Sequence, residues 1–329
     1  MFTTRFSFAH QKVDDILPQT ASVVVFNAQS ADQITALRPR HVTAVQGFAP
    51  VVHALTAAGI RVVQDVNEDF DAAIVLLPKS KSLARDMIAK AAACVKGGVV
   101  LVDGQKSDGI DSVLKDLKRV VSLGPILSKA HGKISWFDAD ADLSAWRSAP
   151  IDLGDGFQTI AGVFSADGVD PASALLAKHV AVVARGVGAD LGSGWGYLTR
   201  NILAVEHVKT LFAIEADFDA HMIAQKNCVD ARVQFCWDDV AKWAPPKPLD
   251  FVVSNPPFHT FGQADPKIGI GFIQTAARIL GPSGQFLMVA NRHLPYEETL
   301  EQCFQMVSEL DGTPKFKVFL AARPRKSKR

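Results

Sequence analysis

Long apolar runs are absent from this chain of 329 residues. The longest, such as AAIVLLP at residues 72–78, are far too short to span a bilayer. Residues 1–15 contain no apolar core followed by a small-residue cleavage site, so we expect no signal peptide. We therefore expect a soluble, cytoplasmic protein with no membrane partner.

Cysteine is also scarce, with four in the whole chain. No two of them form a CxxC pair, and none has a histidine at ligand spacing, so neither a structural zinc site nor a disulfide framework is expected. We expect buried free thiols and no metal. The cysteines are Cys94, Cys228, Cys236 and Cys303.

A large excess of charge of one sign is missing as well, because the formal net charge is only +1. This balance argues against tight, non-specific binding of nucleic acid. Five basic residues nevertheless lie within residues 323–329, where they can contact a phosphate backbone or remain solvated. The charge therefore leaves nucleic acid open as a partner.

What is present is the composition of a globular protein, with 48% hydrophobic and 21% charged residues. Both halves alternate short β-branched runs with helical segments, which is typical of α/β proteins with a mostly parallel sheet. Two predicted strands, at 304–308 and 316–321, flank the turn Asp311-Gly312. They predict an antiparallel hairpin at the end of the chain.

The length predicts two domains. The order of strands and helices in residues 70–139 recurs in residues 249–322, which favours two similar units. We place the boundary near Ala149-Pro150, giving domains 1–150 and 151–329.

The first chemical signal is a glycine-rich segment in which Asp190 is followed by Gly192, Gly194 and Gly196, just before a predicted helix. Glycines there allow a tight turn with a bare backbone, so a ligand can lie against its amides. A nicotinamide fingerprint needs glycine five residues after the first, where Tyr197 stands. The spacing suits a nucleoside with an amino-acid tail, whose ammonium group Asp190 would orient; an ordinary turn is the alternative.

Acidic residues end the next two predicted strands. Glu215 lies 19 positions after Gly196, where a carboxylate can accept hydrogen bonds from both ribose hydroxyls of a nucleoside. Asp238 and Asp239 follow the next strand, where a carboxylate can accept from an adenine amino group. Each acid alone is typical of a helix cap or a solvated turn, but their succession favours a nucleoside site.

The sharpest signal is VVSNPPFH at residues 252–259. Two prolines after a hydrophobic strand force the chain out of the sheet, and Asn255 before them is held extended. The Asn255 carboxamide and the Pro256 carbonyl can then accept hydrogen bonds from an exocyclic amine and aim its lone pair at an electrophilic methyl group. Phe258 offers a flat face for a planar base.

Taken in order, these motifs resemble class I S-adenosylmethionine-dependent methyltransferases that modify exocyclic amines. More narrowly, the chain resembles the bacterial ribosomal RNA guanine-N2 methyltransferases of the small-subunit, RsmC type. The resemblance implies two tandem Rossmann-like units, a mostly parallel seven-stranded sheet and S-adenosylmethionine as cofactor. It implies methyl transfer to guanine N2 of ribosomal RNA, with 16S rRNA or an assembling subunit as partner. The stretches that carry it also include GVFSADGVDPASALL at 162–176 and VANRHLPY at 289–296.

The resemblance also implies roles for individual residues. The methionine part of the cofactor would lie against Phe164, Asp190, Gly192, Ser193, Gly194 and Gly196. Glu215 would hold the ribose, Asp238 and Asp239 the adenine, and Asn255 would touch both cofactor and substrate. The target guanine would be held by Asn255, Pro256, Pro257 and Phe258. The sequence itself offers His259 and Arg292 as candidate contacts to the edge of the base or to flanking phosphates. Trp195 and Arg292 are bulkier than the family pattern.

The first half has neither a glycine turn nor an Asn-Pro-Pro motif, so we expect it to bind no cofactor. We expect it to stabilise the fold and position RNA, with Lys79, Lys81 and Arg85 as candidate phosphate contacts or as solvated surface residues. A monomer is expected. Two alternatives remain open: methylation of another planar amine (a large-subunit guanine, adenine N6 or a protein glutamine), and a non-catalytic RNA-binding module.

Overall fold

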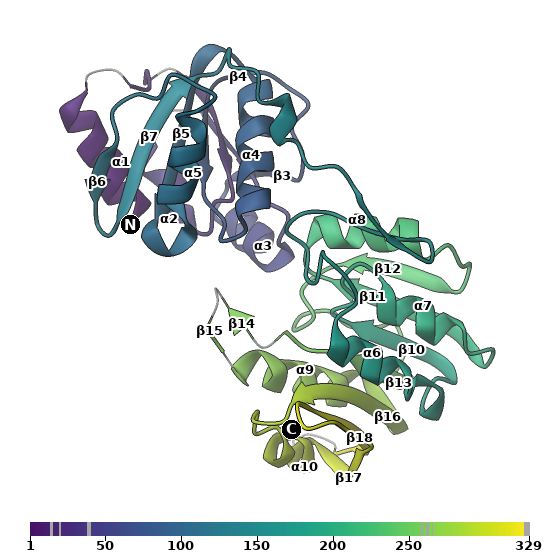
Figure 1. The fold of residues 1–329 in the computed structure, drawn as a ribbon. Helices are drawn as coiled ribbons and strands as arrows, with labels where there is room; N and C mark the ends of the chain where they lie inside the picture. Colours follow the sequence, from purple (N-terminus) through teal and green to yellow (C-terminus); the bar gives the residue numbers. More distant parts are fainter. Residues whose placement is uncertain are drawn as a thin grey trace. The chain divides into compact units, whose positions relative to one another are not determined.

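The computed structural model describes residues 1–329 except 14–15, 20, 38–40, 258, 261–262, 265 and 326–329. The chain divides into two compact units, Met1–Ala149 and Pro150–Arg329, each with its own sheet (Figure 1).

The first unit contains a seven-stranded sheet with the order β3-β2-β1-β4-β5-β7-β6. Strand β7 runs antiparallel to β5 and β6, and the other pairs are parallel. The strands are β1 (Ser22–Phe26), β2 (His41–Val45), β3 (Arg61–Val63), β4 (Phe70–Leu76), β5 (Val95–Gln105), β6 (Leu127–Lys129) and β7 (Gly132–Asp138). The helices are α1 (Phe2–Lys12), α2 (Ala31–Thr35), α3 (Ala49–Ala57), α4 (Lys81–Ala93) and α5 (Ile110–Leu117).

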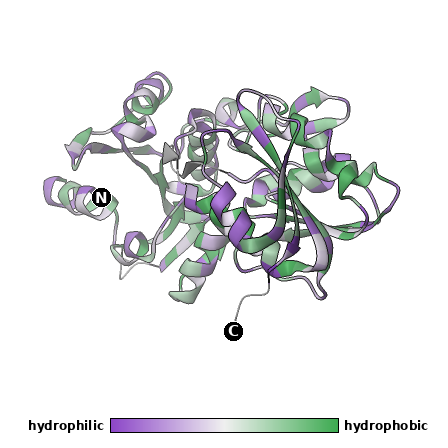
Figure 2. Ribbon diagram, turned by 90° about the horizontal axis from the view of Figure 1, so that it is seen from below, coloured by the Kyte–Doolittle hydropathy of each residue, from purple (hydrophilic) through white to green (hydrophobic). Residues whose placement is uncertain are grey.

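Helices cover both faces of this sheet because successive strand side chains alternate between them. In β1, Val24 and Phe26 belong to the core under α4 and α5, whereas Val23 and Val25 belong to the core under α1, α2 and α3. Figure 2 shows the helices banded with polar and apolar residues around the more apolar strands.

The second unit repeats this plan with the order β12-β11-β10-β13-β16-β18-β17. Its strands are β10 (Gly186–Leu191), β11 (Val208–Glu215), β12 (Val233–Trp237), β13 (Leu249–Ser254), β16 (Leu280–Asn291), β17 (Phe304–Leu310) and β18 (Phe316–Pro324). Two short pairs accompany the sheet, β8 (Ile151–Gly154) with β9 (Phe157–Thr159), and β14 (His259–Thr260) with β15 (Gln263–Ala264). The helices are α6 (Pro171–Ala177), α7 (Tyr197–Leu203), α8 (Phe218–Asn227), α9 (Pro266–Ile279) and α10 (Glu297–Cys303).

The fold expected from the sequence is confirmed: two tandem α/β units, each with a mostly parallel sheet of seven strands. The predicted antiparallel hairpin is β17–β18. The first unit also ends in an antiparallel pair, β6–β7, for which the sequence has no turn signal comparable to Asp311-Gly312. Within β13, Phe251 and Val253 face the core with α6 and α7, while Val252 faces the core with α9 and α10.

The pairing registers of the two sheets align the units residue by residue. Gln46 stands where the second unit has Glu215, and Leu76 stands where it has Asn255. Asn27, just after β1, donates from Nδ2 to the Leu76 carbonyl at 2.8 Å, and Gln46 donates to a loop carbonyl at 2.8 Å. Polar side chains thus bridge the strand ends of the first unit, at the place where open α/β sheets bind ligands.

The sequence predicts no membrane-spanning helix and no disulfide, and both can be compared with the structure. No helix in the described part of the chain is long and apolar enough to cross a membrane. All four cysteines are free; Cys94 and Cys228 are buried, whereas Cys236 and Cys303 are half-buried.

An ion pair inside the first unit yields a prediction about stability. Nε and Nη2 of Arg5 donate to the two carboxylate oxygens of Asp103 at 2.5 and 2.6 Å, and both side chains are only 3% exposed. Arg5→Leu would leave the Asp103 charge buried and unpaired, so we expect the free energy of unfolding to fall by about 3–5 kcal/mol in urea titrations. Lys96→Ala, which breaks an exposed pair with Asp69, should change it by less than about 1 kcal/mol. Equal effects of the two substitutions would contradict this assignment.

Candidate functional site

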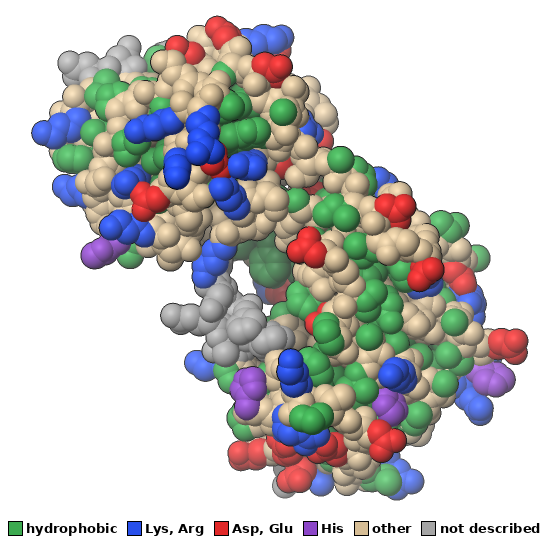
Figure 3. Space-filling view, in the orientation of Figure 1, with side chains coloured by type: hydrophobic (Ala, Val, Ile, Leu, Met, Phe, Trp, Pro, Cys, Tyr) green, Lys and Arg blue, Asp and Glu red, His purple; other side chains and the backbone are tan. Residues whose placement is uncertain are grey.

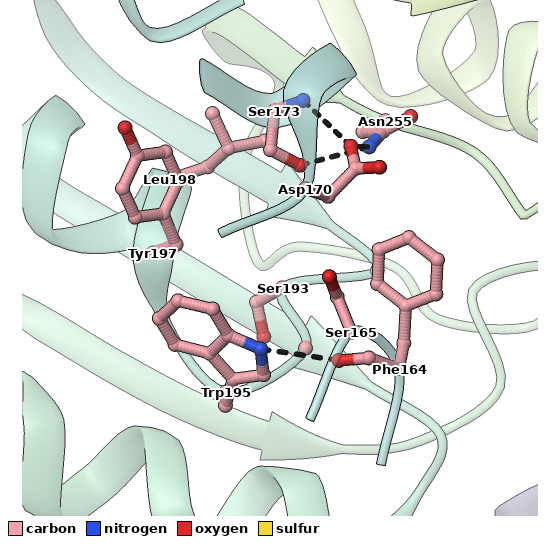
Figure 4. A pocket seen from close by; sticks show the side chains of 11 residues that line it. Phe164, Ser165, Asp170, Ser173, Ser193, Trp195, Tyr197, Leu198 and Asn255 are labelled. Atoms are coloured by element: carbon pink, nitrogen blue, oxygen red, sulfur yellow. Dashed lines mark hydrogen bonds between the residues drawn. The ribbon is translucent and has the colours of Figure 1, made fainter. Parts of the chain in front are cut away.

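A small cavity of about 40 Å³ lies at the carboxyl ends of β10 and β13 in the second unit (Figure 4). It is enclosed by the segment after β9, the start of α6, the glycine turn and the residue after β13. The lining residues are Phe164, Ser165, Asp170, Ser173, Gly192, Ser193, Gly194, Trp195, Tyr197, Leu198 and Asn255. Phe164 is 57% exposed at this cavity, on the segment where the sequence resemblance placed the methionine end of a cofactor.

The glycine turn adopts left-handed backbone angles, with φ of 74° at Gly192 and 55° at Gly194, which glycine alone adopts without strain. The N–H groups of Gly192 and Ser193 both donate to the Ile214 carbonyl, at 2.9 and 3.0 Å. The Gly194 N–H donates to Glu215 Oε2 at 2.7 Å. These three N–H groups are therefore not bare, because they bind the Ile214 carbonyl and the Glu215 carboxylate; the predicted contact of the turn with a cofactor stays a prediction.

Gly196 has a packing role instead. It precedes α7 with φ of 94°, and an added Cβ atom would lie 2.8 Å from the Cys228 sulfur. Gly196 does not line the cavity, whereas the other predicted residues of the turn, Gly192, Ser193 and Gly194, do. Gly196 is needed because the start of α7 approaches α8 closely.

The unexpected bulk of Trp195 has a structural explanation. Its indole Nε1 donates to the Phe164 carbonyl at 3.1 Å, and its ring packs against Phe157 and Tyr197. Asn227 on α8 adds a donated bond to the Trp195 carbonyl at 2.7 Å. These contacts fix the segment after β9 to the glycine turn, so that both walls of the cavity are held together.

Two buried oxygens beside the cavity have no hydrogen-bond partner among the described residues: Asp190 Oδ1 and Ser193 Oγ. The other oxygen of Asp190 accepts from the Thr199 hydroxyl at 2.7 Å. Asp190 itself is fully buried beneath the turn, and this burial raises the pKa of its carboxyl to about 7. A buried polar atom without a partner is rare, and these two are the groups that a polar ligand would satisfy.

Glu215 ends β11 with both carboxylate oxygens facing backbone amides. Gly194 N–H donates to Oε2 and Asp217 N–H donates to Oε1 at 2.8 Å. Loss of hydration raises the pKa of Glu215, and the nearby Asp190 raises it further. Asp217, the N-cap of α8, also has its pKa raised to about 7, mainly by desolvation and then by Glu215. Three carboxyl groups thus share a region that favours a cationic ligand over an anionic one.

The acids after β12 have backbone partners. The Asp238 carboxylate accepts from the Asp239 N–H at 2.7 Å, and the Asp239 carboxylate accepts from the Ala241 N–H at 2.9 Å. Neither of them, nor Glu215, belongs to the lining of the small cavity. Their predicted contacts with adenine and ribose remain predictions.

Asn255 is held at the end of β13 by two donated hydrogen bonds, from Nδ2 to Asp170 Oδ2 at 2.9 Å and to Ser173 Oγ at 2.8 Å (Figure 4). A carboxylate only accepts hydrogen bonds, so the amide nitrogen must face Asp170. Both N–H groups of the carboxamide are used, and Oδ1 remains as an acceptor. The preceding residue, Ser254, donates from its hydroxyl to the Leu191 carbonyl at 2.7 Å and ties the ends of the two strands together.

Asp170 and Ser173 were not singled out as site residues from the sequence. A local signal was present, because Asp followed by Pro171 is typical of a helix N-cap, and Asp170 does accept from the Ser173 N–H at 2.7 Å. Only the packing of α6 against the sheet brings this cap to Asn255.

A second cavity, of about 110 Å³, adjoins the first and shares Asp170 and Asn255 with it. Its walls are largely apolar and aromatic, which suits a planar group. The lining residues are Asp170, Ala172, Asn255, Pro256, Val289, Ala290, Asn291, Leu294, Tyr296 and Phe316.

Among the other residues predicted to contact the target base, the two whose side chains the structure describes, Pro257 and Arg292, line neither cavity. Pro257 directly follows the cavity residues, Phe258 lies outside the described residues, and the same holds for the side chain of His259. Arg292 donates to Glu309 at 2.8 Å and to the Thr313 carbonyl at 3.1 Å. Arg292 therefore braces the loop between β17 and β18.

Two family models match the chain, one for each unit. The family model described as "Methyltransferase small domain" matches residues 155–320, and "Methyltransferase small domain N-terminal" matches residues 13–145. The chain belongs to this methyltransferase family.

Curated relatives of the methyltransferase are named ribosomal RNA small subunit methyltransferase C. The protein from Shewanella halifaxensis is 32% identical over 270 residues, which cover 77% of each chain. The protein from Idiomarina loihiensis is 28% identical over 267 residues, covering 77% of this chain and 78% of the relative.

A solved structure shares the fold over almost the whole length. It is the T. thermophilus 16S rRNA N2 methyltransferase RsmC in complex with AdoMet and guanosine, with a TM-score of 0.79 and 23% identity. The match covers 95% of this chain and 90% of that one.

The burial of Asp190 leads to a prediction for the protein without ligand. Its carboxyl pKa is about 7 in the folded methyltransferase, against an ordinary value of 3.8. The folded state therefore holds this proton more tightly than the unfolded chain, so stability falls as pH rises from about 4 to 7, and the full penalty persists above pH 7. Asp190→Asn removes the charge and should raise the free energy of unfolding at pH 8 by up to about 4 kcal/mol, with a much smaller gain at pH 4.5.

Urea titrations of the wild type and the variant at both pH values measure this difference. Asp167→Asn, at an exposed position three residues before the α6 cap, is the control and should change the free energy of unfolding by less than about 0.5 kcal/mol. A gain of the same size at both pH values would show that the carboxyl does not titrate as stated.

Proposed function

We propose that the second unit transfers a methyl group from S-adenosylmethionine to the exocyclic N2 amine of a guanine in small-subunit ribosomal RNA. The observation that carries this proposal is the Asn255 carboxamide. Both of its N–H groups are used by Asp170 and Ser173, so only an acceptor oxygen is presented beside the two cavities that Asn255 lines. The family membership and the names of the curated relatives support the same activity.

The small cavity and its surroundings fit the cofactor by charge. Bound S-adenosylmethionine supplies an electrophilic methyl group on a sulfonium centre. Asp190 Oδ1 and Ser193 Oγ, which have no partner among the described residues, would accept from its ammonium group or a bridging water. The turn uses the N–H groups of Gly192, Ser193 and Gly194 internally, so it is not built to cradle a phosphate.

Asn255 and Pro256 would position the target amine. Asn255 Oδ1 accepts from one N–H of the amine and the Pro256 carbonyl accepts from the other, which directs the nitrogen lone pair toward the methyl group. As the new N–C bond forms, the bond between the methyl group and the sulfonium sulfur would break and S-adenosylhomocysteine would be the leaving group. The same two oxygens would stabilise the positive charge that develops on the amine. The amine proton then leaves to solvent. Because the amine lies on the Watson–Crick edge, the base must be unpaired when it enters.

We infer that the first unit carries no cofactor and serves to stabilise the protein and position RNA. Gln46 and Leu76 replace the Glu215 and Asn255 of the second unit, and Asn27 bridges the strand ends where the cofactor would lie. These substitutions remove both the carboxylate and the amine acceptor.

Basic side chains of the first unit support RNA contact there. Lys and Arg gather on its face over α4 and α5 in Figure 3. Lys81 and Arg85 both pair with Asp116, at 2.7 and 2.5 Å, and Arg119 lies 3.8 Å from the same carboxylate. Three cations on one carboxylate leave net positive charge, which favours phosphate.

We further propose that the protein acts as a cytoplasmic monomer.

The test of this function is methyl transfer from tritium-labelled S-adenosylmethionine to small-subunit RNA or particles from a strain lacking the gene. We expect the label in N2-methylguanosine at one position, which nuclease mapping identifies, and none in DNA or free protein. Label in N6-methyladenosine or methylglutamine would overturn the guanine assignment. Cofactor binding without any transfer would indicate a non-catalytic module.

Asn255→Ala should lower the rate of this transfer about 10²-fold while cofactor affinity changes less than about two-fold, because the lost acceptor acts chiefly when the amine attacks. Calorimetry gives the affinity and single-turnover kinetics give the rate. Asn201→Ala on α7, whose side chain donates to the Tyr197 carbonyl of its own helix, is the matched control and should change neither. Equal losses of binding and rate would make Asn255 a wall of the cofactor site.

Glu215→Gln reproduces the amide found at the equivalent position of the first unit. It should weaken S-adenosylmethionine binding by about 1.5–3 kcal/mol, because a charged acceptor is lost and the new N–H group opposes an amide of Gly194 or Asp217. Calorimetry measures the change. Glu206→Gln, on the turn after α7, should bind as the wild type does. Unchanged affinity in Glu215→Gln would remove Glu215 from the cofactor site.

A further inference from the structure

Asp170 occupies the junction of the two cavities. It lines both of them, together with Asn255, and it precedes α6 as the helix cap. One carboxylate oxygen, Oδ2, accepts from the Ser173 N–H at 2.7 Å and from Asn255 Nδ2 at 2.9 Å. These two bonds account for the cap and for the orientation of Asn255. Neither of them uses the other oxygen, Oδ1.

Two acceptor oxygens at this junction, Asp170 Oδ1 and Asn255 Oδ1, are not used by the bonds that join Asp170, Ser173 and Asn255. Figure 4 shows both of them on the side of the dashed contacts that faces away from Ser173. Each is held by the same small network, because a shift of either side chain would break the bond between Asp170 Oδ2 and Asn255 Nδ2. Asp170 Oδ1 and Asn255 Oδ1 thus present two hydrogen-bond acceptors held in place at the junction, and the first belongs to a carboxylate.

We propose that Asp170 determines the base specificity of the methyltransferase by accepting a hydrogen bond from N1–H of the target guanine. This inference rests on the proposed function. Guanine presents two adjacent donors on its Watson–Crick edge, N1–H and the N2 amine. Asn255 Oδ1 accepts from the amine, and Asp170 Oδ1 accepts from the neighbouring N1–H.

The same edge disfavours the other amine-bearing bases. Adenine carries a lone pair on N1 beside its amine, and cytosine carries one on N3. Either lone pair would face the Asp170 carboxylate, which repels it and would be left without a donor. A site built to bond a donor rejects an analogue that lacks the donor, because the buried polar group is left unpaired.

The test alters each partner of the proposed hydrogen bond in turn, first Asp170 of the protein and then N1–H of the target base. On the protein, Asp170→Asn is isosteric and caps a helix as well as aspartate does, so the fold should be retained, which unchanged melting would verify. The amide introduced by this substitution would keep its oxygen toward Asn255 and place an N–H₂ group where Oδ1 was. On the RNA, 2-aminopurine keeps the 2-amine but has a lone pair on N1. A synthetic fragment carries guanine or 2-aminopurine at the position mapped by the transfer experiment, ligated into small-subunit RNA.

The measured quantity is the ratio of kcat/KM for the guanine RNA to kcat/KM for the 2-aminopurine RNA. We expect the wild type to prefer guanine, and Asp170→Asn to reduce the ratio about 10- to 100-fold, the range for a hydrogen bond to a charged group. The comparison acts as a double-mutant cycle, in which effects on folding, cofactor binding and Asn255 orientation cancel because they are common to both RNAs. Asp167→Asn should leave the ratio unchanged.

Three results would overturn the proposal. Equal losses on both RNAs in Asp170→Asn would mean that Asp170 only caps α6 and orients Asn255. A shift of the same size in Asp167→Asn would assign the effect to general charge. Failure of the wild type to methylate the guanine RNA would instead remove the proposed function itself, and the specificity role with it.

Discussion

The orientation of one side-chain amide, that of Asn255, depends on a single acceptor, the Asp170 carboxylate. Because the carboxylate cannot donate, the amide nitrogen must turn toward it, and the amide oxygen is left as an acceptor. The two prolines that follow Asn255 end the strand and hold the backbone in place. The restrained backbone and the hydrogen bonds to Asp170 and Ser173 together hold the Asn255 amide oxygen in one orientation, as a preorganised acceptor.

Three carboxyl groups near this site lower the stability of the ligand-free protein. Asp190, Glu215 and Asp217 lie close enough to a shared, poorly hydrated site that burial raises the pKa of each. Such carboxyl groups destabilise the ligand-free protein near neutral pH, and a cationic ligand relieves that cost by pairing with them. The instability of the ligand-free site and its affinity for a positively charged cofactor thus have one cause.

The two units share a fold but differ in the residues at the strand ends where the candidate site of the second unit lies. Their strand orders correspond, and helices cover both faces of each sheet. At the strand ends, Gln46 and Leu76 of the first unit replace a carboxylate and an amide, and Asn27 bonds across the crevice. Gln46 directly follows β2, and Leu76, the last residue of β4, still packs in the core under α1, α2 and α3, so the two sheets keep the same order although these residues differ.

The sequence by itself determined the α/β class, the final hairpin and the clustering of Asp190, Glu215 and Asn255 at one sheet edge, because periodicity and strand-end position are local properties. It did not predict that the amides of the glycine turn bond to β11, or that Trp195 bonds to the Phe164 carbonyl, because both contacts join segments that are distant in the sequence. It missed Asp170, although a local Asp-Pro signal marked a helix cap. Its contact with Asn255 joins residues 85 positions apart, and only the packing of α6 against the sheet decides such a contact.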